Sequence, residues 1–386
     1  MSSLSLRGLT VTTAAGLPLL DEVDLEVADG EQVAIIGPSA TARTALLRTV
    51  VGLQEPDSGE IVVDDVEVRH HAPRRRDMAM VFADYALHPR RDVLDNLTFA
   101  ATLRRGHDRV ELADRVEQVA DDLALRGILG LKPSRLGEDQ RQRVAIGRAL
   151  VRDARLWLFD DPFSAQSERI RPHLRSVVMH WQAARERTSI IATSSVDEAL
   201  SLNVRVAVLH QGRIRQIGSP QELYERPADM FVAGYLGSPP MNLLPAFRDG
   251  DQLVTPLASI RIDQRIEQAI GERSVVIAGV RPEQCIDATQ DAVNVTGGVE
   301  FTTGVDDVEW RGRSQYAFLG FDLDPALAEV LDEVEDMFEF DLFQDFLVAQ
   351  VPSDHQVRPG QSLRVVLPQR DIALFDPETG ENLTLA

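Results

Sequence analysis

Apolar runs of four or five residues alternate with longer amphipathic stretches over the first 236 residues of the chain. The runs have the length and composition of buried strands, and they are Val33–Ile36, Ala79–Phe82, Leu156–Phe159 and Ser189–Thr193. Three- and four-residue apolar spacing predicts helices over Val110–Leu125, Glu138–Val151 and Ile170–Arg187. Strands that alternate with helices in this way predict an α/β domain with a mostly parallel sheet.

The pattern changes after Leu236. Gly237-Ser-Pro-Pro240 is typical of a linker, and short β-like runs separated by turns follow it. We therefore expect a first domain at 1–236, with a helical subdomain at about 88–153, and a small all-β domain at 237–386.

An acidic segment, Asp322–Asp345, interrupts the expected β-domain, with ten acidic residues and no basic ones. Its apolar residues recur at near-helical spacing, which predicts an amphipathic acidic helix. We interpret the segment as an insertion that contacts a protein and lies outside the core of the β-domain. Its apolar stripe would lie either on that domain or in a basic-rimmed groove of a partner.

Composition narrows the range of partners. The chain has 386 residues and a net charge of -21, which argues against nucleic acid as a partner because a phosphate backbone requires a basic face. The single cysteine, Cys285, excludes an internal disulfide framework. No run reaches the about eighteen apolar residues of a membrane span, and the first residues lack the pattern of a signal peptide. We expect a cytoplasmic protein.

A phosphate-binding loop is expected between the Val33–Ile36 strand and the helix that follows it. The pattern G-x-x-x-x-G-K-[ST] binds phosphates with backbone N–H groups and a lysine, and Mg²⁺ with its hydroxyl. Gly37 and Thr44 match this pattern, but Ala42 stands at its second glycine and Arg43 at its lysine. Arginine keeps the charge, but its planar fork does not fit where a compact ammonium does.

Four stretches together resemble one family, and they occur in its usual order and spacing. They are the loop, Gln140-Arg-Gln-Arg-Val-Ala-Ile-Gly-Arg-Ala-Leu150, Leu158-Phe-Asp-Asp-Pro162, and the run from Glu222 to Pro239. The family is the ATP-binding subunits of ABC importers, in the maltose/maltodextrin-type carbohydrate branch. The resemblance extends to Gly279-Val-Arg-Pro-Glu283 and to Leu374-Phe375, in the half where that branch has an OB-like (TOBE) regulatory domain.

The resemblance implies ATP and Mg²⁺ as ligands and assigns roles to individual positions. The catalytic positions would be Asp161, in place of a glutamate, and Ser194, in place of a histidine, while Thr44 and Asp160 would bind Mg²⁺. The nucleotide-binding positions would be Gly37, Pro38, Ser39, Ala40, Ala42, Arg43, Thr44, Ala45 and Gln140.

Several of these positions depart from the family pattern. In the loop, the departures are Ala40, Ala42 and Arg43. Ala83 stands where the family has a glutamine that coordinates Mg²⁺, and Ala15 stands where it has an aromatic residue that stacks on adenine. The family's signature sequence is Leu-Ser-Gly-Gly-Gln, and this chain has Leu136-Gly-Glu-Asp-Gln140 at that place. The chain also has Ser164-Ala-Gln-Ser167 where the family has Ser-Asn-Leu-Asp. Two carboxylates at a helix N-terminus would repel a triphosphate, and loss of a general base slows catalysis by roughly 10²–10⁴. We therefore expect ATP binding to be weak or absent and hydrolysis to be impaired.

The resemblance also implies partners. The chain would dock on ABC permease subunits at the inner face of the membrane, through Tyr85–Pro89 and Asp92–Phe99. It would form a homodimer, or a heterodimer with an intact ATP-binding subunit. Alternatives remain a non-enzymatic regulatory or scaffold protein and an ordinary active ATPase.

Two side-chain roles have alternatives. Arg43 either binds phosphate or pairs with Asp160, and we favour the ion pair. Asp160 and Asp161 either take part in chemistry or only hold the end of the strand.

Overall fold

The computed structural model describes residues 2–102, 108–289, 298–323 and 325–385, and it divides the chain into two compact units, Met1–Pro220 and Gln221–Ala386. The boundary between these units lies before the one expected from the sequence at 236, because the segment with helices α7 (Pro220–Glu225) and α8 (Met230–Tyr235) belongs almost entirely to the second unit.

The first unit contains a six-stranded sheet in the order β10-β9-β3-β8-β7-β6, in which all strands except β10 run parallel. Its strands are β3 (Gln32–Ile36), β6 (Met78–Val81), β7 (Leu156–Asp160), β8 (Thr188–Ala192), β9 (Arg205–His210) and β10 (Arg213–Gly218). Every residue of β3, β6, β7 and β8 is buried, as expected for strands that read as continuous apolar runs. The predicted parallel α/β fold is confirmed.

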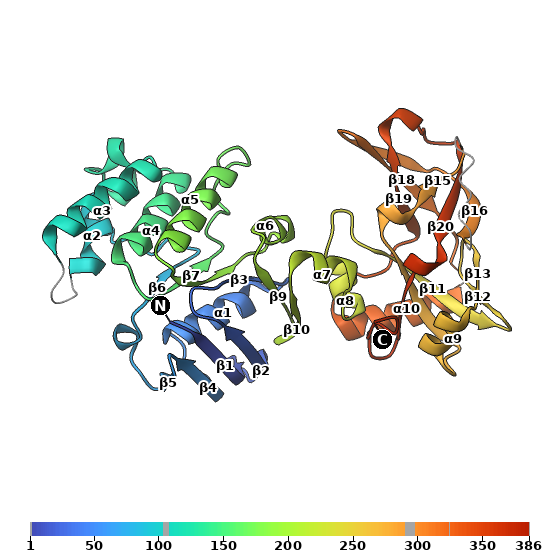
Figure 1. Cartoon of the computed structure of the whole chain (residues 1–386), viewed down its shortest axis with the longest axis horizontal. Coiled ribbons are helices and arrows are strands. Elements are labelled where there is room, and N and C mark those ends of the chain that lie inside the picture. The colour runs from blue at the N-terminus through green and yellow to red at the C-terminus, as the bar shows by residue number, and fades with distance from the viewer. Residues whose placement is uncertain (1, 103–107, 290–297, 324, 386) are drawn as a thin grey trace. The chain divides into compact units, whose positions relative to one another are not determined.

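A smaller antiparallel sheet has the order β2-β1-β4-β5 and shares a core with the parallel sheet and with helix α1 (Ala40–Val51). Its strands are β1 (Leu4–Thr12), β2 (Pro18–Val27), β4 (Ser58–Val63) and β5 (Val66–Glu67). The helices of the unit are α1 (Ala40–Val51), α2 (Val93–Thr102), α3 (Arg109–Asp122), α4 (Glu138–Arg152), α5 (Arg171–Ala184) and α6 (Val196–Ser201). Figure 1 shows α2, α3 and α4 gathered at one end of this unit.

The second unit is rich in strands, in agreement with the predicted all-β, TOBE-type domain. Its sheets have the orders β13-β12-β11-β14-β21, β15-β20-β16 and β17-β18-β19, and they enclose one apolar core. The strands of the first sheet are β11 (Asn242–Asp249), β12 (Gln252–Val254), β13 (Ser259–Arg261), β14 (Val275–Val280) and β21 (Ala373–Phe375). The others are β15 (Ile286–Asp287), β16 (Gly298–Gly304), β17 (Asp307–Arg311), β18 (Ser314–Gly320), β19 (Phe346–Pro352) and β20 (Ser362–Pro368). A short helix that the sequence reading missed, α9 (Gln264–Ile270), precedes β14.

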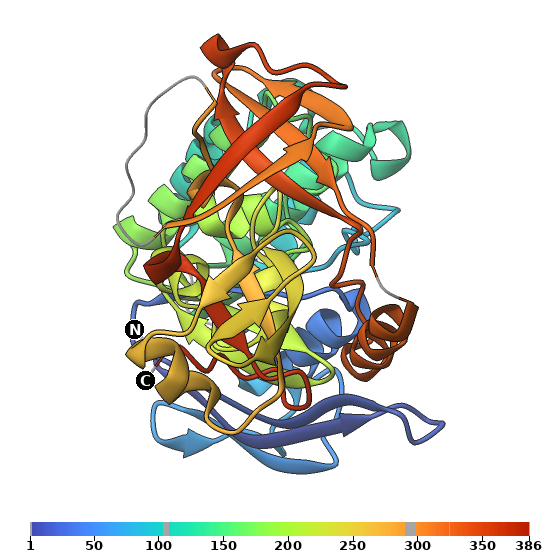
Figure 2. The ribbon, with the colours of Figure 1, turned by 90° about the vertical axis from the view of Figure 1, so that its right-hand side faces the viewer.

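The acidic segment forms helix α10 (Pro325–Phe338), which lies beside the strands of the second unit (Figure 2). Its apolar stripe is buried: Leu331, Val334 and Phe338 are all under 5% exposed. Phe340, just past the helix, packs edge-on against Phe231 of α8, with ring centroids 5.2 Å apart. The stripe therefore lies on its own unit, which is one of the two alternatives expected, and it lies outside the main core cluster of that unit. The side chains of Leu327 and Val330, in the same expected stripe, lie outside the described residues.

Candidate nucleotide site

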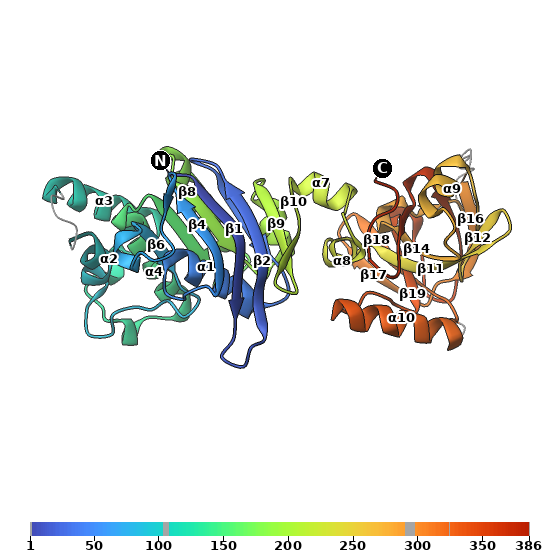
Figure 3. The same ribbon diagram turned by 90° about the horizontal axis from the view of Figure 1, so that it is seen from below.

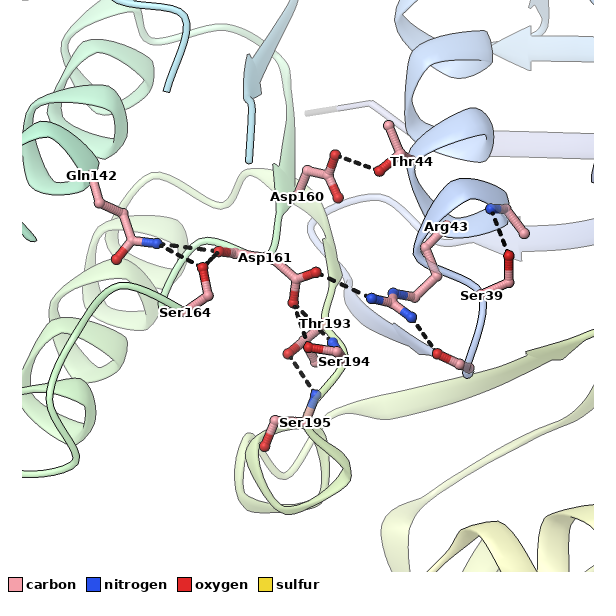
Figure 4. Close-up of polar contacts among 12 residues, drawn as sticks. Ser39, Arg43, Thr44, Gln142, Asp160, Asp161, Ser164, Thr193, Ser194 and Ser195 are labelled. Carbon is pink, nitrogen blue, oxygen red and sulfur yellow. Dashed lines mark hydrogen bonds and ion pairs between the residues drawn. The ribbon is translucent and has the colours of Figure 1, made fainter. Parts of the chain in front are cut away.

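The carboxyl ends of three neighbouring parallel strands, β3, β7 and β8, meet at one edge of the sheet. The backbone holds these ends together: the Asp161 N–H donates to the Ala192 carbonyl at 2.8 Å, and the Thr193 N–H donates to the Ile35 carbonyl at 3.0 Å. The loop after β3, the aspartates after β7 and Ser194 after β8 are therefore neighbours (Figure 4). Ligands commonly bind at this edge of an α/β sheet.

The loop begins at Gly37, where only a glycine fits. A Cβ atom there would lie 1.9 Å from the Leu209 carbonyl oxygen. Helix α1 then starts after Ser39, whose hydroxyl accepts a hydrogen bond from the Ala42 N–H at 3.2 Å, as a helix N-cap does. Ala42 and Ala45 are buried, whereas Pro38, Ser39 and Ala40 are exposed. The strand–loop–helix arrangement is thus that of a phosphate loop.

The Arg43 side chain folds back into this loop and is only 1% exposed. Its guanidinium donates to the Gly37 carbonyl and pairs with the Asp161 carboxylate, with an Nη2–Oδ2 distance of 3.1 Å. The expected ion pair with Asp160 is therefore wrong. Asp160 instead accepts a hydrogen bond from the Thr44 hydroxyl at 2.8 Å, while Asp161, in the left-handed region at φ 43°, points toward Arg43 (Figure 4).

Asp161 has protein partners on both carboxylate oxygens. Oδ2 pairs with Arg43, and Oδ1 accepts from the Ser194 N–H at 2.9 Å and from the Ser194 hydroxyl at 3.2 Å. The two positions expected to be catalytic therefore contact each other directly. Both are tied into an internal network that also includes the loop.

The Asp160 carboxyl is 3% exposed, and this burial is the main reason why its pKa lies above the ordinary value of 3.8. The charge of Asp161 raises the pKa further, while the hydrogen bond from Thr44 and the charge of Arg43 oppose the shift. A hydroxyl and a carboxylate side by side are hard oxygen ligands of the kind Mg²⁺ prefers. Thr44 and Asp160 thus fit the metal role that the sequence assigns to them.

The loop differs from a usual phosphate-binding loop in where its cation points. A phosphate loop binds its ligand with backbone N–H groups and a cation that point into the loop. Here the cation of Arg43 is already neutralised by Asp161 and donates to a loop carbonyl. A hollow of about 500 Å³ remains beside the first turns of α1, and it is lined by Ala40, Thr41, Thr44, Ala45, Arg48, Leu53 and Gln54.

The signature positions lie at the N-terminus of α4. The Gly137 N–H donates to Oε1 of Gln140 at 3.0 Å, Glu138 accepts from the Tyr85 hydroxyl at 3.0 Å, and Asp139 pairs with Arg143 at 3.0 Å. The positive end of the helix dipole is therefore already offset by two carboxylates of its own first turn. Within the described residues, Gln140 makes no hydrogen bond with the loop.

Gln142, which the sequence reading did not single out, links α4 to the strand end. Its amide donates to the Asp161 carbonyl at 3.2 Å and lies 3.3 Å from the Ser164 hydroxyl. Gln142 lies two residues after Gln140, on a helix already assigned to the site, and this position was the signal that could have identified it. Ala15, by contrast, lies exposed in the turn between β1 and β2, so the position expected for an adenine-stacking ring offers only a methyl group.

The chain is similar to known proteins of one family. The family described as ABC transporter matches residues 20–164. The trehalose import ATP-binding protein SugC of Mycobacterium tuberculosis is 35% identical over 391 residues, which cover 100% of this chain and 99% of the relative. The chain belongs to the ABC importer family of ATP-binding subunits. A further relative, the sn-glycerol-3-phosphate import ATP-binding protein UgpC of Bordetella pertussis, is 40% identical over 74% of this chain and 79% of its own length. These matches support the carbohydrate-import branch expected from the sequence.

Solved structures support the fold. The dimeric, post-hydrolysis structure of the ATP-binding cassette MJ0796 with ADP and phosphate has a TM-score of 0.52 and 23% identity, covering 56% of this chain and 98% of that one. ABC ATPases bind ATP with Mg²⁺. No helix in the described part of the chain is long and apolar enough to cross a membrane.

Proposed function

We propose that the chain is the ATP-binding-type subunit of a carbohydrate-class ABC importer, and that its nucleotide site is impaired in binding and hydrolysis. Similarity to SugC over the whole chain supports the transport role and a carbohydrate solute. The proposed impairment rests on one observation, which is that Arg43 and Asp161 form an ion pair with each other. The group that should bind phosphate and the carboxylate that should act as general base are each other's partners at 3.1 Å.

The opposing reading is an ordinary ATPase whose arginine leaves the loop when ATP arrives. That movement would break the pair with Asp161 and the bond to the Gly37 carbonyl, and each lost bond to a charged group costs about 1.5–3 kcal/mol. ATP would have to offset this cost without the loop glycines and without an adenine-stacking ring. The affinity is therefore expected to be low even if the loop can open.

The chain would act on the cytoplasmic face of its permease. A hollow of about 290 Å³ in the first unit would receive a short segment of the permease, and its lining includes Phe82, His88, Phe99 and Arg148. The rings of His88 and Phe99 meet edge-on at 4.7 Å, and the Arg91 guanidinium lies 4.0 Å from the Phe99 ring centroid. These contacts support the proposal because they place two aromatic rings of the lining beside a cation in the region expected to dock.

A heterodimer with an intact ATP-binding subunit is the arrangement best suited to transport. In the family, each ATP lies between the loop of one subunit and the signature of the other. A homodimer would combine two closed loops with two acidic signatures. In a heterodimer, the intact subunit would supply a normal loop to one nucleotide site and a normal signature to the other.

The experiment that tests the proposal measures Mg-ATP binding by calorimetry and phosphate release on the purified chain. We expect weak or undetectable binding and background turnover. Micromolar affinity together with turnover that Asp161→Asn abolishes would show an ordinary ATPase.

A repaired loop sharpens this test. The triple variant Ala40→Gly, Ala42→Gly and Arg43→Lys should recover binding but little hydrolysis, because Asp161, Ser194 and the acidic signature remain. Full turnover from the repaired loop would show that those other departures are harmless.

A further inference from the structure

A cavity of about 300 Å³ lies in the second unit, far along the chain from the nucleotide-site residues. Its walls come from the segment between α8 and β11, from strands β17 to β19, and from the loop after α10, elements that Figure 3 labels. The volume is at the small end of the range for ligand pockets, which suits a compact molecule. We propose that this cavity binds a neutral, hydroxylated small molecule such as a sugar or a polyol.

The inner wall of the cavity is apolar and aromatic. Phe318 and Phe346 lie there with ring centroids 5.3 Å apart at an interplanar angle of 64°, and both rings are only half-buried. Leu243 and Val348 complete this surface. Partly uncovered aromatic rings in a concave wall provide the apolar surface on which the C–H face of a sugar ring packs.

The mouth of the cavity carries polar groups of the kinds that bind hydroxyls. Glu309 and Arg311 form a two-bonded ion pair, with both N–O distances 2.9 Å, and Arg311 also donates to the Ser238 carbonyl and hydroxyl at 3.2 Å. Asp341 and Gln344 line the same mouth, and neither side chain has a polar partner among the residues that the structure describes. A carboxylate accepts from a hydroxyl, and an amide both donates and accepts.

The charges favour a neutral occupant. Glu309 and Arg311 form an ion pair, and Asp341 is the other charged residue among the described residues of the lining. A phosphorylated ligand would meet this carboxylate and the desolvation cost of an apolar inner wall. A cation would be attracted only at the exposed mouth, where solvent weakens the interaction.

The pocket is preformed, which lowers the cost of binding. Asn242 in its floor donates to the Val280 carbonyl at 3.0 Å and the Val348 carbonyl at 2.9 Å, and accepts from the Val348 N–H at 2.7 Å. On the opposite wall, Leu342 packs so closely on α8 that a Cβ at Gly234 would lie 2.9 Å from its Cδ2. A bound ligand would contact the Gly237–Leu243 segment and would thus restrain the stretch between α8 and β11.

The test is a calorimetric titration of the full chain, without nucleotide, against D-glucose, trehalose and glycerol. Glucose 6-phosphate and sn-glycerol 3-phosphate serve as anionic probes, and putrescine as a cationic one. We expect at least one neutral probe to bind, with an affinity that changes less than twofold between low and high salt, because a neutral ligand is hardly screened.

Two variants locate the binding. Asp341→Ala/Gln344→Ala removes exposed side chains and should weaken binding at least tenfold, and so should Phe346→Leu, which keeps an apolar side chain but removes a ring. Asp332→Ala/Gln268→Ala, a matched pair of exposed residues outside the cavity, should leave affinity unchanged.

Three results would overturn the proposal: no neutral probe binds, only a charged probe binds, or all variants bind alike. The titration omits nucleotide, and the variants lie in the second unit. Failure of this proposal is therefore distinguishable from failure of the proposed function.

Discussion

The side chains of Arg43 and Asp161 differ in length from the family's residues in opposite directions. Arginine is longer than the lysine it replaces, and aspartate is one methylene shorter than the glutamate it replaces. The longer side chain reaches across the loop to the shorter one, at 3.1 Å, and its cation is almost fully buried. Breaking this pair is unfavourable, because the buried Arg43 cation would lose its carboxylate partner.

The first prediction is a double-mutant cycle. Arg43→Met should lower the free energy of unfolding by about 1–3 kcal/mol, because it leaves Asp161 with Ser194 alone. In the double variant with Asp161→Asn, the two losses should fail to add, with a coupling of about 0.5–3 kcal/mol. Urea unfolding measures all four proteins. Arg7→Met, at a wide and exposed pair, is the control and should change little. A coupling near zero would show that the pair does not hold the loop.

The second prediction concerns pH. The folded-state pKa of Asp160 is raised, so the folded chain binds more protons than the unfolded one between 3.8 and the raised value. Its contribution to stability is therefore favourable at acid pH and is lost as the pH rises through this interval. Asp160→Asn keeps an acceptor for Thr44 and removes the buried charge. It should raise the unfolding temperature at pH 7, and the gain should shrink toward pH 4.

Thermal unfolding of wild type and variant at several pH values measures this effect. Asp65→Asn, at an exposed turn residue, is the matched control and should show no such trend. A gain that is constant with pH would mean that the buried charge is not its cause.

The sequence predicted which residues meet at this site but not which of two adjacent carboxylates takes the cation. Patterns of apolar runs place Asp160 and Asp161 at the same strand end. Their directions depend on where the strand stops and on the left-handed conformation of Asp161, which no local pattern announces for an aspartate. The reciprocal change in length at positions 43 and 161 was the one available signal.

Among the elements, α10 shows what periodicity can and cannot predict. The near-helical spacing of its apolar residues correctly predicted a helix, but it left open whether the apolar stripe lies on the second unit or in a groove of a partner. The structure buries Leu331, Val334 and Phe338 within the second unit, while Asp332, Glu333 and Asp336 are exposed. Composition gives the exposed side of an amphipathic helix, but the surface that covers its apolar side belongs to residues distant in sequence.

The third prediction follows from this packing. Deleting Asp324–Gln344 would uncover Phe231, which is fully buried. Phe338→Ala should already cost about 3–5 kcal/mol, because the ring fits against the turn at Gly380, where a Cβ would lie 2.3 Å from Cζ. Asp336→Ala, on the exposed face, should change stability by less than about 0.5 kcal/mol. Equal unfolding midpoints for the two variants would show that the stripe contributes nothing.

The molecule has two units with separate cores, and the sequence predicted the strands of one core better than those of the other. Continuous apolar runs identified the parallel sheet of the first unit. The second unit was predicted only as a class, because short strands such as β12 and β13, at three residues each, carry too little periodicity to be located. In the proposed dimer, a nucleotide site completed by two subunits would place the signature of this chain next to the loop of its partner.

The fourth prediction concerns that shared site. In a dimer with an intact ATP-binding subunit, the partner's loop would hold ATP against the acidic start of α4 in this chain. Each carboxylate there disfavours an anion by about 0.3–1 kcal/mol. Glu138→Gln/Asp139→Asn should therefore raise turnover of the mixed dimer by about 3- to 30-fold, while the isolated chain stays at background. Asp114→Asn/Glu117→Gln removes the same charge from the exposed face of α3 and should leave turnover unchanged. If both pairs raise turnover alike, net charge and not the signature is responsible; if neither does, the start of α4 does not face the partner's nucleotide.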